Sequence, residues 1–209
     1  MTQNEELFAK EKVGKLLLKF SIPAIIALLV NELYNMVDTL FVGRVIGGNA
    51  IGALVVVFPI QRIVAAISMM LAIGSSTFVA RKNGEGDYKG INDVMKNGIS
   101  LALAIMIPLS ILTFIFKDNI LIMLGASENI LPYAHDYLSI IIFGSTFLCL
   151  TTVMGYIMMA LGNRKVTVAS TSLGAILNII IDYILVFKFN YGVKGAAVAT
   201  VISQIMGFL

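Results

Sequence analysis

Residues 166–187 read VTVASTSLGAILNIIIDYILVF, an apolar stretch whose single charged residue is Asp182. About 20 apolar residues carry a helix across the hydrocarbon core of a bilayer, so this stretch predicts a membrane-spanning helix. A carboxylate inside such a helix costs a few kcal/mol or more, and an intramembrane acid is therefore a functional-site hypothesis by default. A second aspartate, Asp38, lies in another apolar stretch near the start of the chain. The two acids together indicate a transporter.

The composition places the whole chain in a lipid bilayer. It is 58% hydrophobic and 13% charged, with a mean hydropathy of +0.93, whereas soluble domains are about 45–50% apolar and about 25% charged. Too few polar residues remain to cover a soluble globule of this size. We therefore expect an all-α integral membrane protein. The single cysteine, Cys149, excludes a disulfide within the chain and is interpreted as a small packing residue.

Six apolar segments are separated by short polar breaks, among them residues 81–96 and 117–129. The predicted helices cover residues 16–43, 51–80, 98–116, 131–161, 166–187 and 195–209. The last segment stops at Leu209 without a closing polar tail, so we expect an incomplete sixth helix. Residues 1–209 are interpreted as one six-helix bundle that forms the first half of a longer membrane protein.

Basic residues in short loops predict the orientation of the helices. If the N-terminus is cytoplasmic, ten basic residues lie in the inside segments, namely Lys10, Lys12, Lys15, Lys19, Arg81, Lys82, Lys89, Lys96, Arg164 and Lys165. Four lie in the outside segments, namely Arg44, Lys117, Lys188 and Lys194. This asymmetry predicts a multi-pass protein of the cell (inner) membrane with a cytoplasmic N-terminus.

This orientation brings four polar side chains to one depth, in the outer half of the predicted bundle. Asp38 and Asp182 lie near the outer ends of the first and fifth helices, and Tyr137 and Thr200 lie a few residues into the fourth and sixth helices from the outside. Polar residues in spanning helices face the bundle interior or a water-filled cavity. We therefore expect these four residues to form one polar cluster.

Further polar residues share helix faces with the two acids. Asn178 and Asp182 are four residues apart and stack on one face, and Asn31 and Asn35 share a face with Asp38 in the same way. An oxygen-rich cluster suits a hard cation, and an acid withdrawn from water beside another acid binds a proton more readily. The cluster therefore predicts coupling to Na⁺ or H⁺. A purely structural role, in which these groups only join helices through hydrogen bonds, stays open.

Five segments along the chain form a distinctive set of motifs: Phe20-Ser21-Ile22-Pro23, YNMVDTLFV at 34–42, GYIMMALGN at 155–163, NIIIDYIL at 178–185 and GVKGAAVAT at 192–200. In order and spacing they resemble the multidrug and toxic compound extrusion (MATE) family, over essentially the whole chain. The resemblance implies a twelve-helix protein of two six-helix lobes that expels cationic amphipathic compounds in exchange for Na⁺ or H⁺. This chain then corresponds to most of the N-terminal lobe. Its partner is a C-terminal lobe or a second chain.

The resemblance also implies the site residues. The family's N-lobe cation site falls on Asp38, Tyr137, Asn178, Asp182 and Thr200. For a sodium-coupled transporter, the implied Na⁺ ligands are Asp38, Asn178, Asp182 and Thr200. Pro23 matches a proline associated with bending of the first helix, and proline kinks a helix because it lacks the backbone N–H. The first helix is thus the implied moving part.

Glu32 and Arg62 lie near mid-membrane in the first and second predicted helices, at about 1.5 Å of rise per residue. An arginine at this depth is costly unless it is paired. We therefore predict an ion pair between the two side chains, with a role in substrate selection as the alternative. The resemblance assigns neither residue a function.

Other classes of function fit the sequence less well. An intramembrane enzyme needs a nucleophile–base pair or a metal dyad on facing helices, and the chain has one histidine and one cysteine, so we expect no enzyme. A flippase for lipid-linked saccharides from the same superfamily is an alternative, although Arg62 alone would meet an anionic headgroup. A non-transporting membrane subunit is another. We expect a cationic small-molecule substrate, no cofactor and no nucleic acid partner.

Overall fold

The computed structural model describes residues 14, 15, 22, 36 and 39–209, and residues 39–209 belong to one compact unit. A helical segment at 39–46 precedes the main elements. These are α3 (Gly48–Gly84), α4 (Tyr88–Ile115), α5 (Lys117–Met123), α6 (Leu131–Ala160), α7 (Arg164–Asp182), the π-helix η1 (Tyr183–Lys188) and α8 (Gly192–Phe208). Within this part of the chain, every regular element is a helix.

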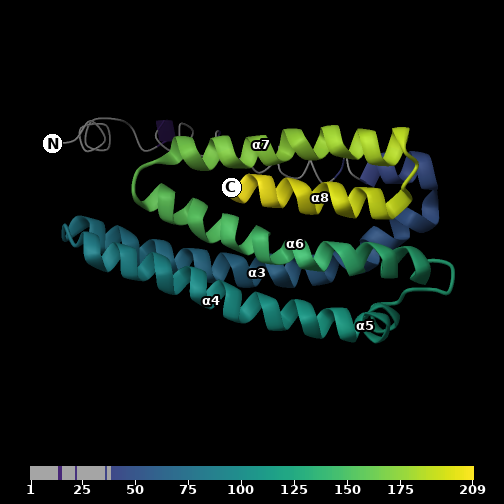
Figure 1. Cartoon of the computed structure of the whole chain (residues 1–209), viewed down its shortest axis with the longest axis horizontal. Helices are drawn as coiled ribbons and strands as arrows, with labels where there is room; N and C mark the ends of the chain where they lie inside the picture. Colours follow the sequence, from purple (N-terminus) through teal and green to yellow (C-terminus); the bar gives the residue numbers. More distant parts are fainter. Residues whose placement is uncertain (1–13, 16–21, 23–35, 37–38) are drawn as a thin grey trace. The chain divides into compact units, whose positions relative to one another are not determined.

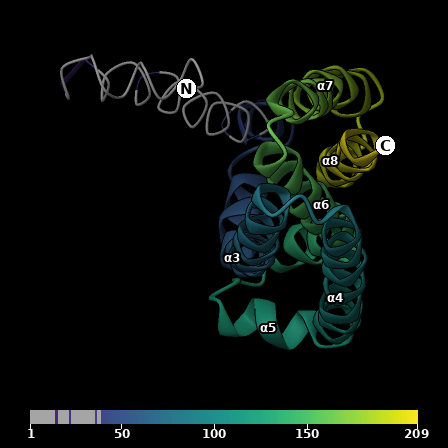
Figure 2. The same ribbon diagram turned by 90° about the vertical axis from the view of Figure 1, so that its left-hand side faces the viewer.

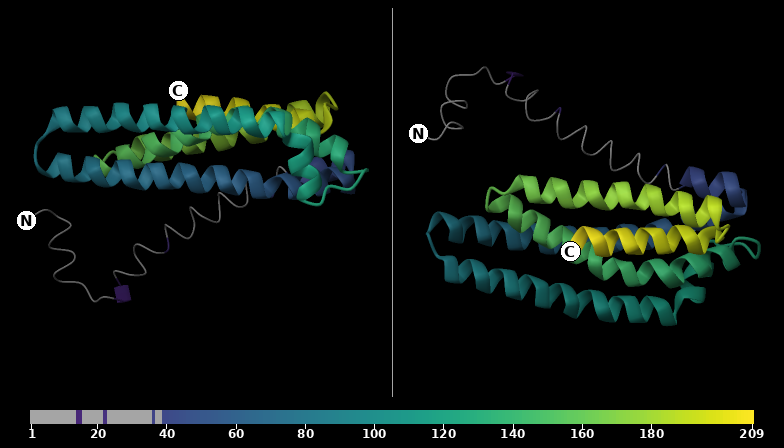
Figure 3. Two further views of the ribbon diagram at one scale, coloured as in Figure 1. Left: turned by 90° about the horizontal axis from the view of Figure 1, so that it is seen from below. Right: turned by 45° about the horizontal axis from the view of Figure 1, so that its top comes forward.

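Helix α6 lies at the centre of the bundle. It packs against α3 and α4 on one side and against α8 on the other, and α7 packs against α8 (Figures 1 and 2). The α3–α4 turn and the α6–α7 turn lie at one end, whereas the short helix α5 lies at the opposite end (Figures 1 and 3). The basic residues Arg81, Lys82 and Arg164, which flank the two turns, therefore share one end of the bundle.

Four of the described helical segments are long and apolar enough to cross a membrane: Gly48–Gly84, Tyr88–Ile115, Leu131–Ala160 and Arg164–Lys188, the last of which joins α7 and η1. Helix α8 is a shorter apolar helix. Large apolar side chains such as Val55, Ile111 and Ile180 are exposed on the bundle, as expected of helices that face lipid. The prediction of an all-α membrane protein is confirmed. The predicted helix over residues 16–43 lies largely outside the described residues.

The α3–α4 connection is shorter than predicted. The sequence predicted a polar connection over residues 81–96, whereas α3 continues to Gly84 and α4 begins at Tyr88. Asp87 caps α4 by accepting a hydrogen bond from the backbone N–H of Gly90 at 2.9 Å. Hydropathy detects only the part of a helix that lies in lipid. Because the cap satisfies a backbone N–H group of the first turn, the helix can begin in water, before its apolar run starts.

The predicted polar break over residues 117–129 also contains a helix. Helix α5 covers Lys117–Met123, and its Leu121 side chain is fully buried. Lys117 Nζ lies 4.0 Å from the centre of the Phe114 ring at the end of α4. Helix α5 thus has charged groups at its start and one side covered by the bundle. Its apolar run is too short to cross a membrane, so the sequence did not predict a helix here.

Two buried clusters form the packed interior of the bundle. The cluster towards α5 includes Val57, Leu121, Leu138, Val186 and Ala196. The second, towards the α3–α4 turn, includes Leu71, Met106, Cys149, Val153 and Ile157. Lipid tails are as apolar as these side chains, so close packing rather than exclusion from water holds such helices together. Cys149 is fully buried, as a small packing residue should be.

Candidate functional site

Asn178 and Thr200 meet between α7 and α8. Asn178 donates from Nδ2 to Thr200 Oγ1 at 3.3 Å, and Thr200 Oγ1 donates to the backbone oxygen of Ala196 at 3.1 Å. Asn178 is 1% exposed and Thr200 is 8% exposed. The structure thus brings together two of the predicted site residues, which are 22 positions apart in the sequence.

Asp182 is the last residue of α7, one helical turn after Asn178, and its side chain is 0% exposed. Residues four apart share a helix face, so the carboxyl group and the amide lie on the same side of α7. A carboxylate enclosed among apolar helices is far less stable than one in water. The free energy of this part of the bundle therefore depends strongly on whether the carboxyl group is charged.

Helix α7 widens into η1 directly after Asp182. At the end of η1, the backbone N–H of Phe189 donates to the oxygen of Ile184 at 3.0 Å, one residue further along the chain than in an α-helix. π-Helical turns are rare and occur frequently at functional sites. The buried acid is therefore the last residue before a change of helix type.

Small residues bring α7 and α8 close together. A Cβ atom on Gly174 would lie 3.2 Å from the backbone oxygen of Ser203 and 3.9 Å from Gly207 Cα. Across the same interface, Ser170 Oγ donates to the backbone oxygen of Gly207. Small residues let helix backbones approach closely in a membrane. This closeness lets the short amide and hydroxyl side chains described above reach each other.

Tyr137 lies on α6 and is 3% exposed. Gln61 Nε2, on α3, lies 3.5 Å from the Tyr137 hydroxyl oxygen, which is long for a hydrogen bond. Tyr137 belongs to the same buried cluster as Val186 of η1 and Ala196 of α8. It therefore packs in the buried cluster towards α5, which also contains a residue of η1.

Three of the predicted residues lie outside what the structure describes, and all three belong to the first predicted helix. These are Asp38, Pro23 and Glu32. Arg62 is described, and its guanidinium carbon lies 4.3 Å from the centre of the Phe58 ring, in a cation–π contact. The Glu32–Arg62 ion pair stays a prediction.

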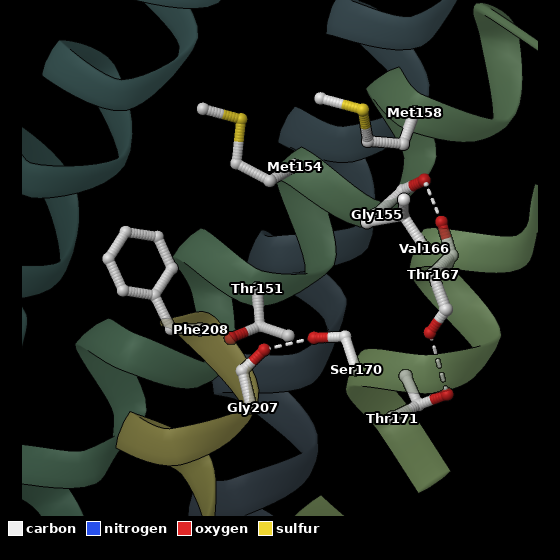
Figure 4. Close-up of a pocket in the computed structure, with 10 residues that line it drawn as sticks. All are labelled: Thr151, Met154, Gly155, Met158, Val166, Thr167, Ser170, Thr171, Gly207 and Phe208. Carbon is white, nitrogen blue, oxygen red and sulfur yellow. Dashed lines mark hydrogen bonds between the residues drawn. The ribbon is translucent and has the colours of Figure 1, made fainter. Parts of the chain in front are cut away.

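A pocket of about 300 Å³ lies between α6, α7 and α8 (Figure 4). It is lined by uncharged residues, namely Thr151, Met154, Gly155, Met158, Val166, Thr167, Ser170, Thr171, Gly207 and Phe208. Thioether side chains such as Met154 and Met158 are flexible and adapt to different ligand shapes. The volume lies at the lower end of the range for drug-sized ligands, about 300–1,000 Å³.

The hydroxyl groups of the pocket donate to backbone oxygens and not to the open space. Thr167 Oγ1 donates to Gly155 at 3.0 Å, and Thr171 Oγ1 donates to Thr167 at 2.9 Å (Figure 4). Thr151 Oγ1 donates to Phe147 at 2.8 Å. Each hydroxyl hydrogen is thus used, and the oxygens keep lone pairs that accept. The lining suits an apolar compound that carries a positive charge or hydrogen-bond donors.

Sequence reasoning missed Gln61, Gln204 and the pocket hydroxyls. Gln61 and Gln204 are amides inside apolar segments, the same signal that singled out Asp38 and Asp182, and both were identifiable on that basis. The hydroxyls were not identifiable, because serine and threonine that bond to carbonyls of their own helix are common in spanning segments.

These elements define a multi-pass helical membrane protein with an acid, an amide and a hydroxyl buried between two of its helices. The family model MatE matches residues 23–184. The chain belongs to this family, the MATE transporters, as its motifs implied.

Known relatives carry names that refer to drug export. Multidrug export protein MepA of Staphylococcus aureus (strain NCTC 8325 / PS 47) is 28% identical over 202 residues, which cover 97% of this chain and 45% of the relative. The protein of the same name from Staphylococcus haemolyticus (strain JCSC1435) is 29% identical over 204 residues, which cover 97% of this chain and 45% of the relative. The chain thus spans about half the length of the curated relatives it matches.

Solved structures show the same relation in three dimensions. The crystal structure of MATE in the bent conformation matches with a TM-score of 0.83 and 27% identity, covering 93% of this chain and 43% of the other. The expected fold class, half of a two-lobe transporter, is confirmed by this match.

Proposed function

We propose that residues 1–209 form the N-terminal lobe of a cation-coupled antiporter that exports cationic amphipathic compounds. Family membership and the names of the relatives support the class of activity. The observation that carries the proposal is the burial of Asp182 at 0% exposure beside the Asn178–Thr200 contact. A buried titratable acid with oxygen-bearing neighbours is what an ion-driven cycle needs, because the ion must bind the two conformations differently.

The coupling site consists of Asp182, Asn178, Thr200 and Tyr137, together with Asp38 from the first helix. The carboxyl group would carry the proton or bind Na⁺. The amide and hydroxyl oxygens are the hard ligands that Na⁺ prefers over nitrogen or sulfur. The first predicted helix would respond to neutralisation of the acids by repacking around Pro23, and the substrate would be released outward. The Glu32–Arg62 pair would lock the first helix to α3.

The substrate site is the uncharged pocket between α6, α7 and α8. Its thioethers and apolar walls would hold an aromatic body, and its hydroxyl oxygens would face the positive charge of the substrate. Thr171 and Ser170 of α7 line this pocket, and Asn178 lies further along the same helix. One helix therefore connects the proposed substrate pocket with the proposed coupling site.

Filling the pocket tests the proposed function. In the two-lobe transporter, Thr171→Trp is expected to reduce export of ethidium at least tenfold, because the indole ring occupies the space that the substrate needs. Export is measured from loaded proteoliposomes under an imposed H⁺ or Na⁺ gradient. The control is Val168→Trp, on the same helix at a position 62% exposed and outside the pocket lining. Equal export by the two variants would place the substrate elsewhere.

We also propose that the N-terminus is cytoplasmic and that the protein is in the cell membrane. A cysteine at Lys89 is expected to react with an impermeant maleimide only from the cytoplasmic side, and a cysteine at Lys188 only from outside. Both lysines are exposed. Lys89 lies in the first turn of α4 and Lys188 ends η1, and these two helix ends lie at opposite ends of the bundle (Figure 1). Native Cys149 is buried and gives a low background. Labelling of Lys89→Cys in intact cells would contradict the orientation.

A further inference from the structure

Gln204 is an amide in the apolar helix α8. It lies one turn after Thr200, in the proposed coupling site, and one turn before Phe208, which lines the pocket. Its neighbour across the helix interface is α6, since a Cβ atom on Gly144 would clash with Gln204 Oε1. Gln204 therefore occupies the α6–α8 interface between the two proposed sites.

Because Gly144 has no side chain, it leaves a niche on α6, and the end of the Gln204 side chain lies in this niche. A Cβ atom at this position would also lie 2.9 Å from Val201 Cγ2, so α8 approaches α6 closely here. Gln204 Oε1 is buried, and it has no hydrogen-bond partner among residues 39–209 as the structure describes them. The oxygen instead lies in the space that the missing side chain of Gly144 leaves open.

The two ends of the amide differ in their access to a ligand. The carbonyl oxygen is enclosed, whereas Gln204 as a whole is only half-buried. Nε2 is not among the buried polar atoms that lack a partner. The part of the amide that a ligand reaches is therefore the NH₂ group, which carries two hydrogens and no acceptor. Gln204 does not itself line the pocket, but it lies four residues before Phe208, which does, and residues four apart share a helix face. Its donor therefore lies one helical turn along α8 from the acceptors of the pocket.

We propose that Gln204 determines substrate specificity by donating a hydrogen bond from Nε2 to an oxygen acceptor on the exported compound. The compounds favoured are lipophilic cations that also carry a carbonyl, ester or carboxylate oxygen. The pocket hydroxyls and thioethers receive the cationic body, and the Gln204 amide recognises the oxygen. This inference rests on the proposed function, and it adds the acceptor group to the description of the substrate.

The test compares two cations in wild-type protein and in Gln204→Met, which keeps the length and shape of the side chain but removes the amide. Rhodamine 6G carries an ester carbonyl, and tetraphenylphosphonium carries no acceptor. In the two-lobe transporter, Gln204→Met is expected to raise the KM for rhodamine 6G about three- to tenfold, the worth of one neutral hydrogen bond. The KM for tetraphenylphosphonium is expected to stay unchanged. Equal effects on both compounds, or none on either, would overturn the proposal.

Gly144→Ala tests whether the niche orients the amide. The added methyl displaces Oε1, so the variant is expected to weaken rhodamine 6G binding selectively in the wild-type background. The same change made in the Gln204→Met background should have no further selective effect. A double-mutant cycle measures this difference. An identical selective effect of Gly144→Ala in both backgrounds would show that the glycine acts through helix packing and not through the amide.

A second variant and a binding assay test the role of Gln204 separately from the proposed function. If Gln204→Met does not fold, Gln204→Asn retains an amide that is one methylene too short, and the same selective loss is expected. Binding of both cations to the purified protein is measured by fluorescence competition alongside transport. If wild-type protein binds rhodamine 6G but exports nothing, the proposed function is wrong. If Gln204→Met changes the binding of the two cations equally, or changes neither, the role of Gln204 is wrong.

Discussion

Export driven by an ion gradient is expected to fall to the background rate when Asp182 is replaced by asparagine. Asparagine keeps the size and much of the hydrogen bonding of aspartate but has no charge for H⁺ or Na⁺ to neutralise. Because the side chain is 0% exposed, the charged and neutral forms differ greatly in free energy at this position. Without that difference the ion has no preference between the two conformations, and coupling ends. Tetraphenylphosphonium efflux from proteoliposomes measures the effect.

The controls separate coupling from folding. Asp118→Asn makes the same chemical change on α5, where the carboxyl group is 60% exposed, and it is expected to leave export unchanged. Thr200→Val and Asn178→Ala are expected to give partial losses, and Asp38→Asn a loss as complete as that of Asp182→Asn. The Asp182→Asn protein should elute from size-exclusion chromatography like the wild type. Export at the wild-type rate would mean that the carboxyl group only joins helices.

Gly174→Val is expected to give the largest loss of stability of any single substitution considered. A branched side chain at Gly174 meets the backbone oxygen of Ser203, which lies 3.2 Å from the position of a Cβ atom, and a backbone atom does not move aside easily. Overpacking costs about 1–3 kcal/mol, so the thermal midpoint should fall by several degrees. Separation of α7 from α8 should also break the Asn178–Thr200 hydrogen bond.

The matched control is Gly74→Val. Gly74 lies inside α3, and a Cβ atom there would have no neighbour within 4 Å. The backbone context and the substitution are the same, so the change in helix propensity is shared and the difference between the two variants reports the close contact. Thermal midpoints of the detergent-solubilised proteins, followed by fluorescence size-exclusion chromatography, provide the measurement. Similar midpoints for the two variants would show that α7 and α8 tolerate greater separation.

The membrane fold was predictable because it depends on runs of apolar residues, which a sequence displays directly. The stacking of Asn178 on Asp182 was predictable for a similar reason, since it depends only on the period of one helix, and the structure buries both side chains. Helix α5 and the extension of α4 back to Tyr88 were not, because both lie beyond the apolar runs.

The Gln204 niche and the pocket were beyond prediction for a different reason. Each depends on how closely two helices approach, and the approach of α8 to α6 depends on a glycine 60 residues earlier in the sequence. Nothing in the local pattern around Gln204 indicates which end of its amide is enclosed. The functional roles of Asp38, Tyr137, Asn178, Asp182 and Thr200 stay predictions, to be decided by the transport measurements.

The π-helix after Asp182 shifts the phase of the helix at the acid. Up to Asp182 each residue turns the chain by about 100°, and the wider turn of η1 then offsets every later side chain from the position that a continuous α-helix would give it. In this offset phase Val186 is fully buried, whereas Tyr183 and Phe187 are 57% and 42% exposed. Asp182 thus lies at the junction of two helical registers. A change in the register of η1 would rotate the side chains after the acid and leave the face that carries Asn178 in place.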